Sequence, residues 1–249
     1  MDGALVSKSR CFQVLLSLAS LCLASSGACT PYIGTTYQSF IRQARENPDP
    51  NIRYIAYAKL GSPSLYEDYA QKNEAVKIML GKLDEGREPV AIRAAIIRSL
   101  GNLGDRRARR VILKGINDTD NAVIRVEACR ALGKVGLPED ATTLARIMII
   151  DKLEDCRIAA IEAIGTLKTK EPRIYQILLE GMDNEDPAIR YQCLQSLRTL
   201  TDKDLGIDPE AWRRELEPIL TATPASAAPK SKTSAPEKKV AAQTMLGPK

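Results

Sequence analysis

The stretch that decides the fold is Asn121 to Gly136, NAVIRVEACRALGKVG, because it has the pattern of one amphipathic helix. Counted from Arg125, apolar residues stand one position before and four and seven positions after, at Ile124, Cys129 and Leu132. This spacing places all three on one face of a helix. We expect Gly136 to end the helix as a C′ glycine.

The same pattern recurs along the chain. The other segments are DPNIRYIAYAKLG (Asp49 to Gly61), PVAIRAAIIRSLGNLG (Pro89 to Gly104), LEDCRIAAIEAIGTL (Leu153 to Leu167) and DPAIRYQCLQSLRTL (Asp186 to Leu200). Their shared arginines are Arg53, Arg93, Arg125, Arg157 and Arg190, at separations of 40, 32, 32 and 33 residues. A near-constant period of this length indicates an internal structural repeat.

A second amphipathic stretch precedes these segments. Examples are Glu74 to Leu83, Ala108 to Ile116, Asp140 to Ile149 and Pro172 to Met182. The repeated unit is therefore helix, short turn, helix, and a single pair cannot bury its own apolar face. We predict an all-α solenoid of about five stacked helix pairs. A final helix, Pro209 to Leu220, should cap the last repeat, with Trp212 covering its open end.

The repeated segments resemble HEAT repeats of the short kind, similar to those of the phycobilisome-lyase HEAT-like group. The shared core is A-I-R-x-x-A-x-x-x-L-G, and the resemblance covers about residues 35–200. It implies the solenoid fold strongly and a function only weakly. That group includes bilin lyases, but no residue pattern here marks a bilin site, so the lyase activity is not carried over.

The two ends differ from the middle of the chain. Residues 1–28 are typical of a signal peptide, with Lys8 and Arg10 before a 14-residue apolar run that is too short to span a bilayer. They resemble a bacterial lipoprotein signal, which implies a lipid on Cys29, although Ser26 stands where that pattern has an aliphatic residue. Cleavage without lipidation and an uncleaved segment are the alternatives.

The domain organisation that follows is a signal peptide (1–28), a HEAT-like repeat domain (29–220) and a disordered tail (221–249). The tail is rich in Pro, Ala and Lys and has no periodic apolar face. The net charge of +5 comes from the two ends, which leaves the repeat domain close to neutral. A nucleic-acid binder needs a concentrated basic face, so nucleic acid is not an expected partner.

Catalytic and metal-binding patterns are scarce in this sequence. The chain has no histidine, which removes His-based nucleophile activation and imidazole metal ligands. Cys129, Cys156 and Cys193 are expected to be buried free thiols, with a bridge between adjacent repeats as the alternative. We predict no catalytic residues, no metal and no cofactor.

The five shared arginines favour a structural interpretation over a binding one. Carboxylates lie shortly before most of them in the chain, at Asp49, Glu88, Asp120 and Asp186. Such carboxylates can bridge a helix N-terminus and the arginine of the neighbouring repeat. We therefore expect an inter-repeat ladder of paired charges.

The second helices should line the concave face, with positions two, five and nine after each arginine pointing outward. Eight residues of this set with charged or amide side chains are the predicted partner-binding residues: Arg98, Asn102, Glu127, Arg130, Lys134, Glu162, Gln192 and Gln195. Their mixed charge suits a protein or peptide partner. An ordinary solvated face is the alternative interpretation.

These observations predict a non-enzymatic scaffold of the bacterial cell envelope, anchored through Cys29, that binds a protein partner on its concave face. Its expected location is the membrane, facing the periplasm, or the soluble periplasm if Cys29 carries no lipid. The alternatives are a lyase-like or other small-ligand enzyme on a HEAT scaffold, and a purely structural role in which the charged tail engages the wall or membrane.

Overall fold

The computed structural model describes residues 34–221, so the predictions for the signal peptide, for Cys29 and for the tail lie outside the described residues. The described part holds eleven α-helices. They are α2 (Tyr37–Glu46), α3 (Pro50–Leu60), α4 (Tyr69–Glu85), α5 (Val90–Leu103), α6 (Arg109–Ile116), α7 (Ala122–Val135), α8 (Ala141–Ile150), α9 (Glu154–Thr166), α10 (Pro172–Gly181), α11 (Pro187–Thr201) and α12 (Pro209–Thr221). Short 3₁₀ turns, η1 (Pro63–Leu65), η2 (Arg106–Ala108) and η3 (Pro138–Asp140), lie in the connections.

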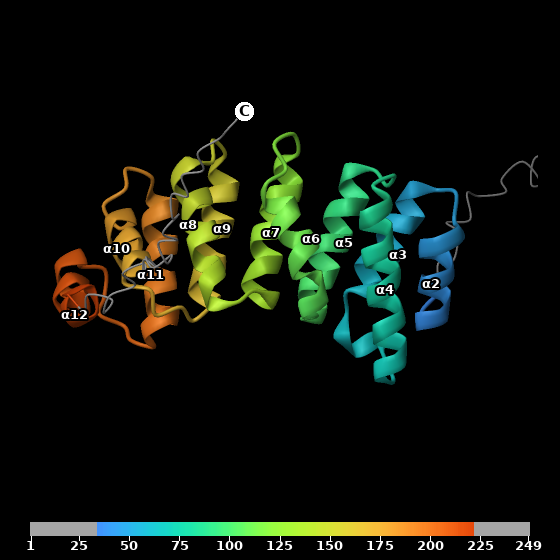
Figure 1. Ribbon diagram of the computed structural model, residues 1–249, viewed down its shortest axis with the longest axis horizontal. Helices are drawn as coiled ribbons and strands as arrows, with labels where there is room; N and C mark the ends of the chain where they lie inside the picture. The colour runs from blue at the N-terminus through green and yellow to red at the C-terminus, as the bar shows by residue number, and fades with distance from the viewer. Residues whose placement is uncertain (1–33, 222–249) are drawn as a thin grey trace, which may run out of the picture.

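The helices follow one another in chain order along an elongated stack, from α2 at one end to α12 at the other (Figure 1). Each odd-numbered helix from α3 to α11 packs on the even-numbered helix before it, which gives the five helix pairs predicted from the repeat. The second helices α3, α5, α7, α9 and α11 also contact one another extensively, whereas the first helices of successive pairs touch far less. The second helices therefore form the inner, tightly spaced side of an all-α solenoid.

Local sequence explains where the second helices begin. Asp49 accepts a hydrogen bond from the Asn51 backbone N–H at 2.8 Å, and Asp186 accepts one from Ala188 N–H at 2.8 Å. These N-caps satisfy backbone donors that the first helical turn leaves free. A proline follows each of these aspartates and fits the first helical turn, where its missing N–H is not needed.

Glycines end two neighbouring helices in different ways. Gly104 ends α5 in the left-handed conformation, with φ of 65°, as a C′ glycine does. Gly136 also ends α7, but its φ is −72°, so the prediction of a left-handed C′ glycine is wrong there. A Cβ at Gly136 would lie 2.5 Å from the Leu132 carbonyl oxygen, and this close approach is why glycine is required.

A row of glycines sets the close spacing of the second helices, and the sequence analysis missed it. The glycine eight positions after the shared arginine faces a small residue of the next second helix. The pairs are Gly61 with Ser99, Gly101 with Ala131, Gly133 with Ala163 and Gly165 with Ser196. A Cβ on any of these glycines would lie 2.8 to 3.0 Å from the facing Cα, so larger residues would push the helices apart.

The row stops at both ends of the stack. In the first repeat the small facing residue is replaced by Lys59, and in the last repeat the glycine is replaced by Arg198. Arg198 instead donates a hydrogen bond to Asp204 at 2.9 Å. Each terminal second helix therefore carries a long charged residue where a further second helix would have to pack.

Helix α12 closes the C-terminal end, with bounds within one residue of the predicted helix. Trp212 is fully buried, and its indole N–H donates to the Gly206 carbonyl at 3.0 Å. The helix packs against α10. From Tyr37 to Leu216 the buried apolar side chains form one continuous core.

Candidate functional site

The inner side of the stack carries a chain of alternating charges that we call the inner strip. It consists of Arg98 on α5, Glu127 and Arg130 on α7, and Glu162 on α9, with Asn102 and Lys134 one turn further along α5 and α7. Arg98 donates two hydrogen bonds to Glu127, from Nε to Oε2 at 2.9 Å and from Nη2 to Oε1 at 2.7 Å. Arg130 lies 3.7 Å from Glu127 and 3.8 Å from Glu162. The strip thus connects three successive repeats.

Helical periodicity explains this alignment. Arg98, Arg130 and Glu162 each stand five positions after the shared arginine of their repeat, and Asn102 and Lys134 stand nine after it. Equivalent positions on closely stacked helices lie side by side, so the charges meet across the repeat boundaries. All five side chains are exposed, as the sequence predicted for these positions.

The prediction for the position two after the arginine is wrong for three of the five repeats. Ala95, Glu127 and Ala159 are buried, at 1%, 5% and 0% exposure, instead of pointing outward. This position lies between neighbouring second helices rather than on the free surface. Glu127 is accommodated there because both of its oxygens accept hydrogen bonds from Arg98.

In the Arg98–Glu127 pair, which is the shortest ion pair of the strip, the two side chains differ in exposure. The Glu127 side chain is 7% exposed, whereas that of Arg98 is 46% exposed. The hydrogen bonds with Glu127 raise the pKa of Arg98 against the opposing effect of burial. A bidentate pair of this kind fixes the guanidinium plane and leaves its outer edge available to a second acceptor.

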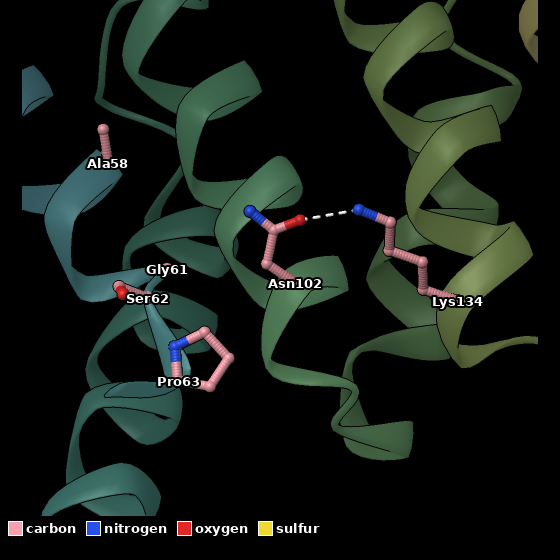
Figure 2. A pocket seen from close by; sticks show the side chains of 6 residues that line it. All are labelled: Ala58, Gly61, Ser62, Pro63, Asn102 and Lys134. Carbon is pink, nitrogen blue, oxygen red and sulfur yellow. Dashed lines mark hydrogen bonds between the residues drawn. The ribbon is translucent and has the colours of Figure 1, made fainter. Parts of the chain in front are cut away.

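Shallow hollows adjoin the strip on its N-terminal side. Lys134 Nζ donates to Asn102 Oδ1 at 2.7 Å, and this pair forms one wall of a hollow of about 570 Å³ whose opposite wall is Ala58 to Pro63 (Figure 2). A second hollow of about 250 Å³ is lined by Arg98, Glu127 and Arg130 together with Asn102 and Lys134. Five of the eight predicted partner-binding residues therefore surround one depression.

The remaining predicted binding residues lie away from that depression. Glu162 extends the strip through its contact with Arg130. Gln192 and Gln195 lie on α11, are half-buried, and form no side-chain hydrogen bond within residues 34–221. The strip is therefore charged over its centre and neutral towards α11.

The predicted arginine ladder is present at two repeat boundaries. Arg53 donates to Glu88 at 3.0 and 3.2 Å, and Arg125 donates to Asp151 at 2.8 and 3.1 Å. Both carboxylates belong to the turn of the following repeat and are almost fully buried, at 9% and 5% side-chain exposure. Of the four carboxylates expected to serve the ladder, only Glu88 does so within the described residues; the expectation is wrong for Asp49, Asp120 and Asp186.

The other three shared arginines have no carboxylate partner within residues 34–221. Arg190 donates instead to the backbone carbonyls of Asn184 and Glu185, each at 2.8 Å. Arg93 and Arg157 have buried Nε atoms without a hydrogen-bond acceptor. The sequence missed a further inter-repeat pair, in which Arg109 donates to Asp140 at 2.7 Å, because neither residue belongs to the repeated motif.

The cysteines show no sign of a reactive thiol. Cys129, Cys156 and Cys193 are buried and free, as we expected from the sequence. Burial raises the pKa of Cys129 and of Cys193 to about 12, and it also raises the pKa of Cys156. Such thiols stay protonated near neutral pH and are poor nucleophiles.

Two further properties bear on the function. Within residues 34–221, no group of three or more Cys, Asp or Glu residues is placed to hold a metal ion. Over the same range, none of the helices combines the length and the apolar character that a membrane crossing needs.

Comparisons with known proteins agree with the repeat assignment. Residues 79–165 match the family of HEAT repeats. A chain from the complex of CpcE and CpcF of phycocyanin lyase from Nostoc sp. PCC7120 has a similar fold, with a TM-score of 0.55 and 17% sequence identity over 73% of this chain and 68% of that chain. At that identity the likeness concerns the fold alone. A search of curated protein sequences gives no match. Residues 79–165 therefore carry HEAT repeats, and the stacked helix pairs and the shared fold show an all-α solenoid over the described residues 34–221.

Proposed function

We propose that this HEAT-repeat chain is a non-enzymatic scaffold that binds a protein partner along the inner strip. The observation that carries the proposal is the inter-repeat chain of charges Arg98–Glu127–Arg130–Glu162, in which every side chain except that of Glu127 is exposed. It presents both signs of charge in a fixed order, which gives a partner both register and specificity. Arginine is also enriched where protein interfaces concentrate their binding energy.

The shape of the inner side supports a protein partner over a small molecule. Small-molecule sites are usually enclosed and mostly apolar. The two hollows beside the strip are open to solvent, and both are lined by the polar residues Asn102 and Lys134. The fold neighbour from the CpcE and CpcF complex is itself part of an assembly, which is compatible with a binding role for this fold.

The test is a charge reversal with an internal control. Arg130→Glu should reduce recovery of the crosslinked partner by about tenfold or more, because it places like charges in the interface. The double variant Arg130→Glu/Glu162→Arg restores an internal ion pair but inverts the surface pattern, so it should fold normally and still fail to bind. Arg173→Glu, on the exposed side of α10, is the matched control. Full binding by the double variant would contradict the proposal.

A lyase-like or other enzymatic activity is the alternative, and the buried thiols provide its test. Because burial raises the pKa of Cys129 and Cys193 to about 12, the native full chain should resist iodoacetamide at pH 8. The same cysteines should react fully in urea. Rapid native alkylation of Cys129, Cys156 or Cys193, measured by peptide mass spectrometry, would favour a catalytic cysteine instead.

We also propose that the scaffold is exported and held at the bacterial membrane by a lipid on Cys29. The support is the sequence of residues 1–29, in which a basic start and an apolar run precede small residues and a cysteine. Intact-mass spectrometry of the native protein tests this. A chain that begins at Cys29 with diacylglycerol and acyl additions supports the anchor, and a chain that begins there without lipid indicates a soluble periplasmic protein. Retention of residues 1–28 contradicts export.

A further inference from the structure

The shared arginines provide four comparable repeat boundaries, and at two of them, those of Arg93 and Arg157, the arginine has no carboxylate partner within residues 34–221. Arg53 and Arg125 each hold a buried carboxylate from the next repeat, at Glu88 and Asp151. At the boundary between the second and third pairs, Arg93 has no side-chain hydrogen bond within residues 34–221, and its Nε is buried without an acceptor. The Arg93 side chain as a whole is half-buried, but a buried N–H without an acceptor is costly. Its Nε–H therefore lacks the carboxylate acceptor that Glu88 supplies to Arg53 and Asp151 supplies to Arg125.

The carboxylate nearest in the turn, that of Asp118, accepts hydrogen bonds from its own turn and not from Arg93. Asp118 lies in the turn after α6. Burial tends to raise its pKa, but hydrogen bonds from Asn121 and Asp120, and to a smaller extent the charge of Arg93, lower it. Its oxygens accept hydrogen bonds from the backbone N–H groups of Asp120, at 3.0 Å, and Asn121, at 2.9 Å, and from the Asn121 side chain. Asp118 therefore stabilises its own turn and makes no ion pair with Arg93.

A cavity lies where the missing partner would be. It has a volume of about 550 Å³ and is lined by Arg93 together with residues of α4, α5, α6 and α7. Its walls include the aliphatic side chains of Leu83, Ile97, Val111 and Ile124. Asp84 and Asp120 are exposed and lie among its lining residues. The cavity shares no residue with the inner strip.

These features define the chemistry of a ligand. We propose that the cavity beside Arg93 binds an aliphatic carboxylate with a cationic far end, its carboxylate pairing with Arg93 as Glu88 pairs with Arg53. The aliphatic stem packs against Leu83, Ile97 and Val111. The cationic end lies beside Asp120, which forms no ion pair within residues 34–221. Asp84 already lies 3.7 Å from Arg110, and the exposed Lys114 also lines the cavity. This site is additional to the protein-binding strip and does not depend on it.

The experiment observes the arginine directly. The full chain, labelled with ¹⁵N-arginine, gives separate Nε–Hε signals, and Arg93→Lys identifies the signal of Arg93 while keeping its charge. With hexanoate, the Arg93 signal should move and saturate with a Kd of about 1 to 10 mM, as expected for so small a ligand. Hexanamide, which lacks the charge, should bind more weakly. The Arg53 and Arg125 signals should stay in place, because the Nε–H groups of these arginines already donate to Glu88 and Asp151.

A second probe tests the acidic rim. 6-Aminohexanoate should bind about twofold to fivefold more tightly than hexanoate, the gain expected from an exposed ion pair. Hexylamine should leave the Arg93 signal unmoved. An Arg93 signal that ignores both carboxylates, or an Arg53 signal that moves equally, would overturn the site. Weaker binding of 6-aminohexanoate than of hexanoate would overturn the assignment of the cationic end.

Discussion

Two sets of arginine–carboxylate contacts cross the repeat boundaries of this molecule, and they differ mainly in burial. In the ladder, the side chains of Arg125 and Asp151 are 15% and 5% exposed. In the inner strip, those of Arg130 and Glu162 are 47% and 55% exposed. Buried pairs hold the repeats in register, whereas exposed pairs contribute little to stability and remain accessible to a partner. Glu127 of the strip is as buried as the ladder carboxylates, at 7% side-chain exposure. What separates the two sets is the exposure of the arginine, which is 46% and 47% for Arg98 and Arg130 but 19% and 15% for Arg53 and Arg125.

The largest expected effect comes from breaking the buried set. Asp151→Ala removes both carboxylate acceptors of Arg125, which keeps only its hydrogen bond to the Asp118 carbonyl, and it removes the acceptor of the Leu153 N–H. It leaves an uncompensated charge in a buried place, so we expect a loss of about 3–5 kcal/mol in the free energy of unfolding. Urea unfolding followed by circular dichroism measures it.

The matched change in the exposed set is Glu162→Ala. Its contact with Arg130 is long, at 3.8 Å, and open to solvent, so the loss should stay below about 1 kcal/mol. Equal losses for Asp151→Ala and Glu162→Ala would show that burial does not distinguish the two sets.

The next effect concerns the close spacing that brings the strip together. A Cβ at Gly133 would lie 2.9 Å from the Ala163 Cα, so Gly133→Ala should cost about 1–3 kcal/mol by forcing α7 and α9 apart. Gly81→Ala in α4 is the control, because nothing lies within 4 Å of its added Cβ and alanine favours the helix. A Gly133→Ala protein as stable as the parent would refute the role of the glycine row.

The buried carboxylates should also make the free energy of unfolding depend on pH. Burial, the largest single effect, tends to raise the pKa of Asp151 and of Asp140. The hydrogen bond and the charge of Arg125 or Arg109, together with a hydrogen bond from a backbone N–H, jointly outweigh burial and lower both pKa values below the ordinary 3.8. A lowered folded-state pKa contributes stability above pH 3.8 that is lost as the pH falls through the folded value. The unfolding free energy should therefore drop below about pH 4.

Replacing one of these groups tests the cause. Asp151→Asn should make the acid loss shallower, since one titrating carboxylate is removed. Urea titrations at pH values from about 2 to 7 measure the slopes of the parent and of the variant. An unchanged slope in Asp151→Asn would mean that other groups control the acid response.

The repeated motif predicted the fold well because its information is local. The apolar positions around Arg125 identify one helix face, and the period of the arginines identifies the stack. The glycine row was also readable, since glycine stands eight positions after the shared arginine in four repeats. Its meaning is clear only once the facing residues, about 30 positions away, are known.

The site was harder to predict because its contacts join distant residues. Glu127 is buried because Arg98, 29 residues earlier, supplies both of its hydrogen bonds. Arg93 and Arg125 occupy the same place in the repeat, yet only Arg125 has a partner. The difference arises in the turns, where Asp118 binds its own backbone and Asp151 reaches across to Arg125. A repeat alignment averages out such differences.

The most direct test of the central claim is a map of where the partner touches the scaffold. A photo-crosslinking amino acid is placed in the full chain at Asn102 or Lys134 on the inner side, and at Lys77 or Gln176 on the exposed sides of α4 and α10. We predict one partner adduct of constant mass from the inner positions, lost when Arg130→Glu is added, and none from the outer positions. Equal adducts from the outer positions, or inner adducts that survive Arg130→Glu, would contradict binding along the inner strip.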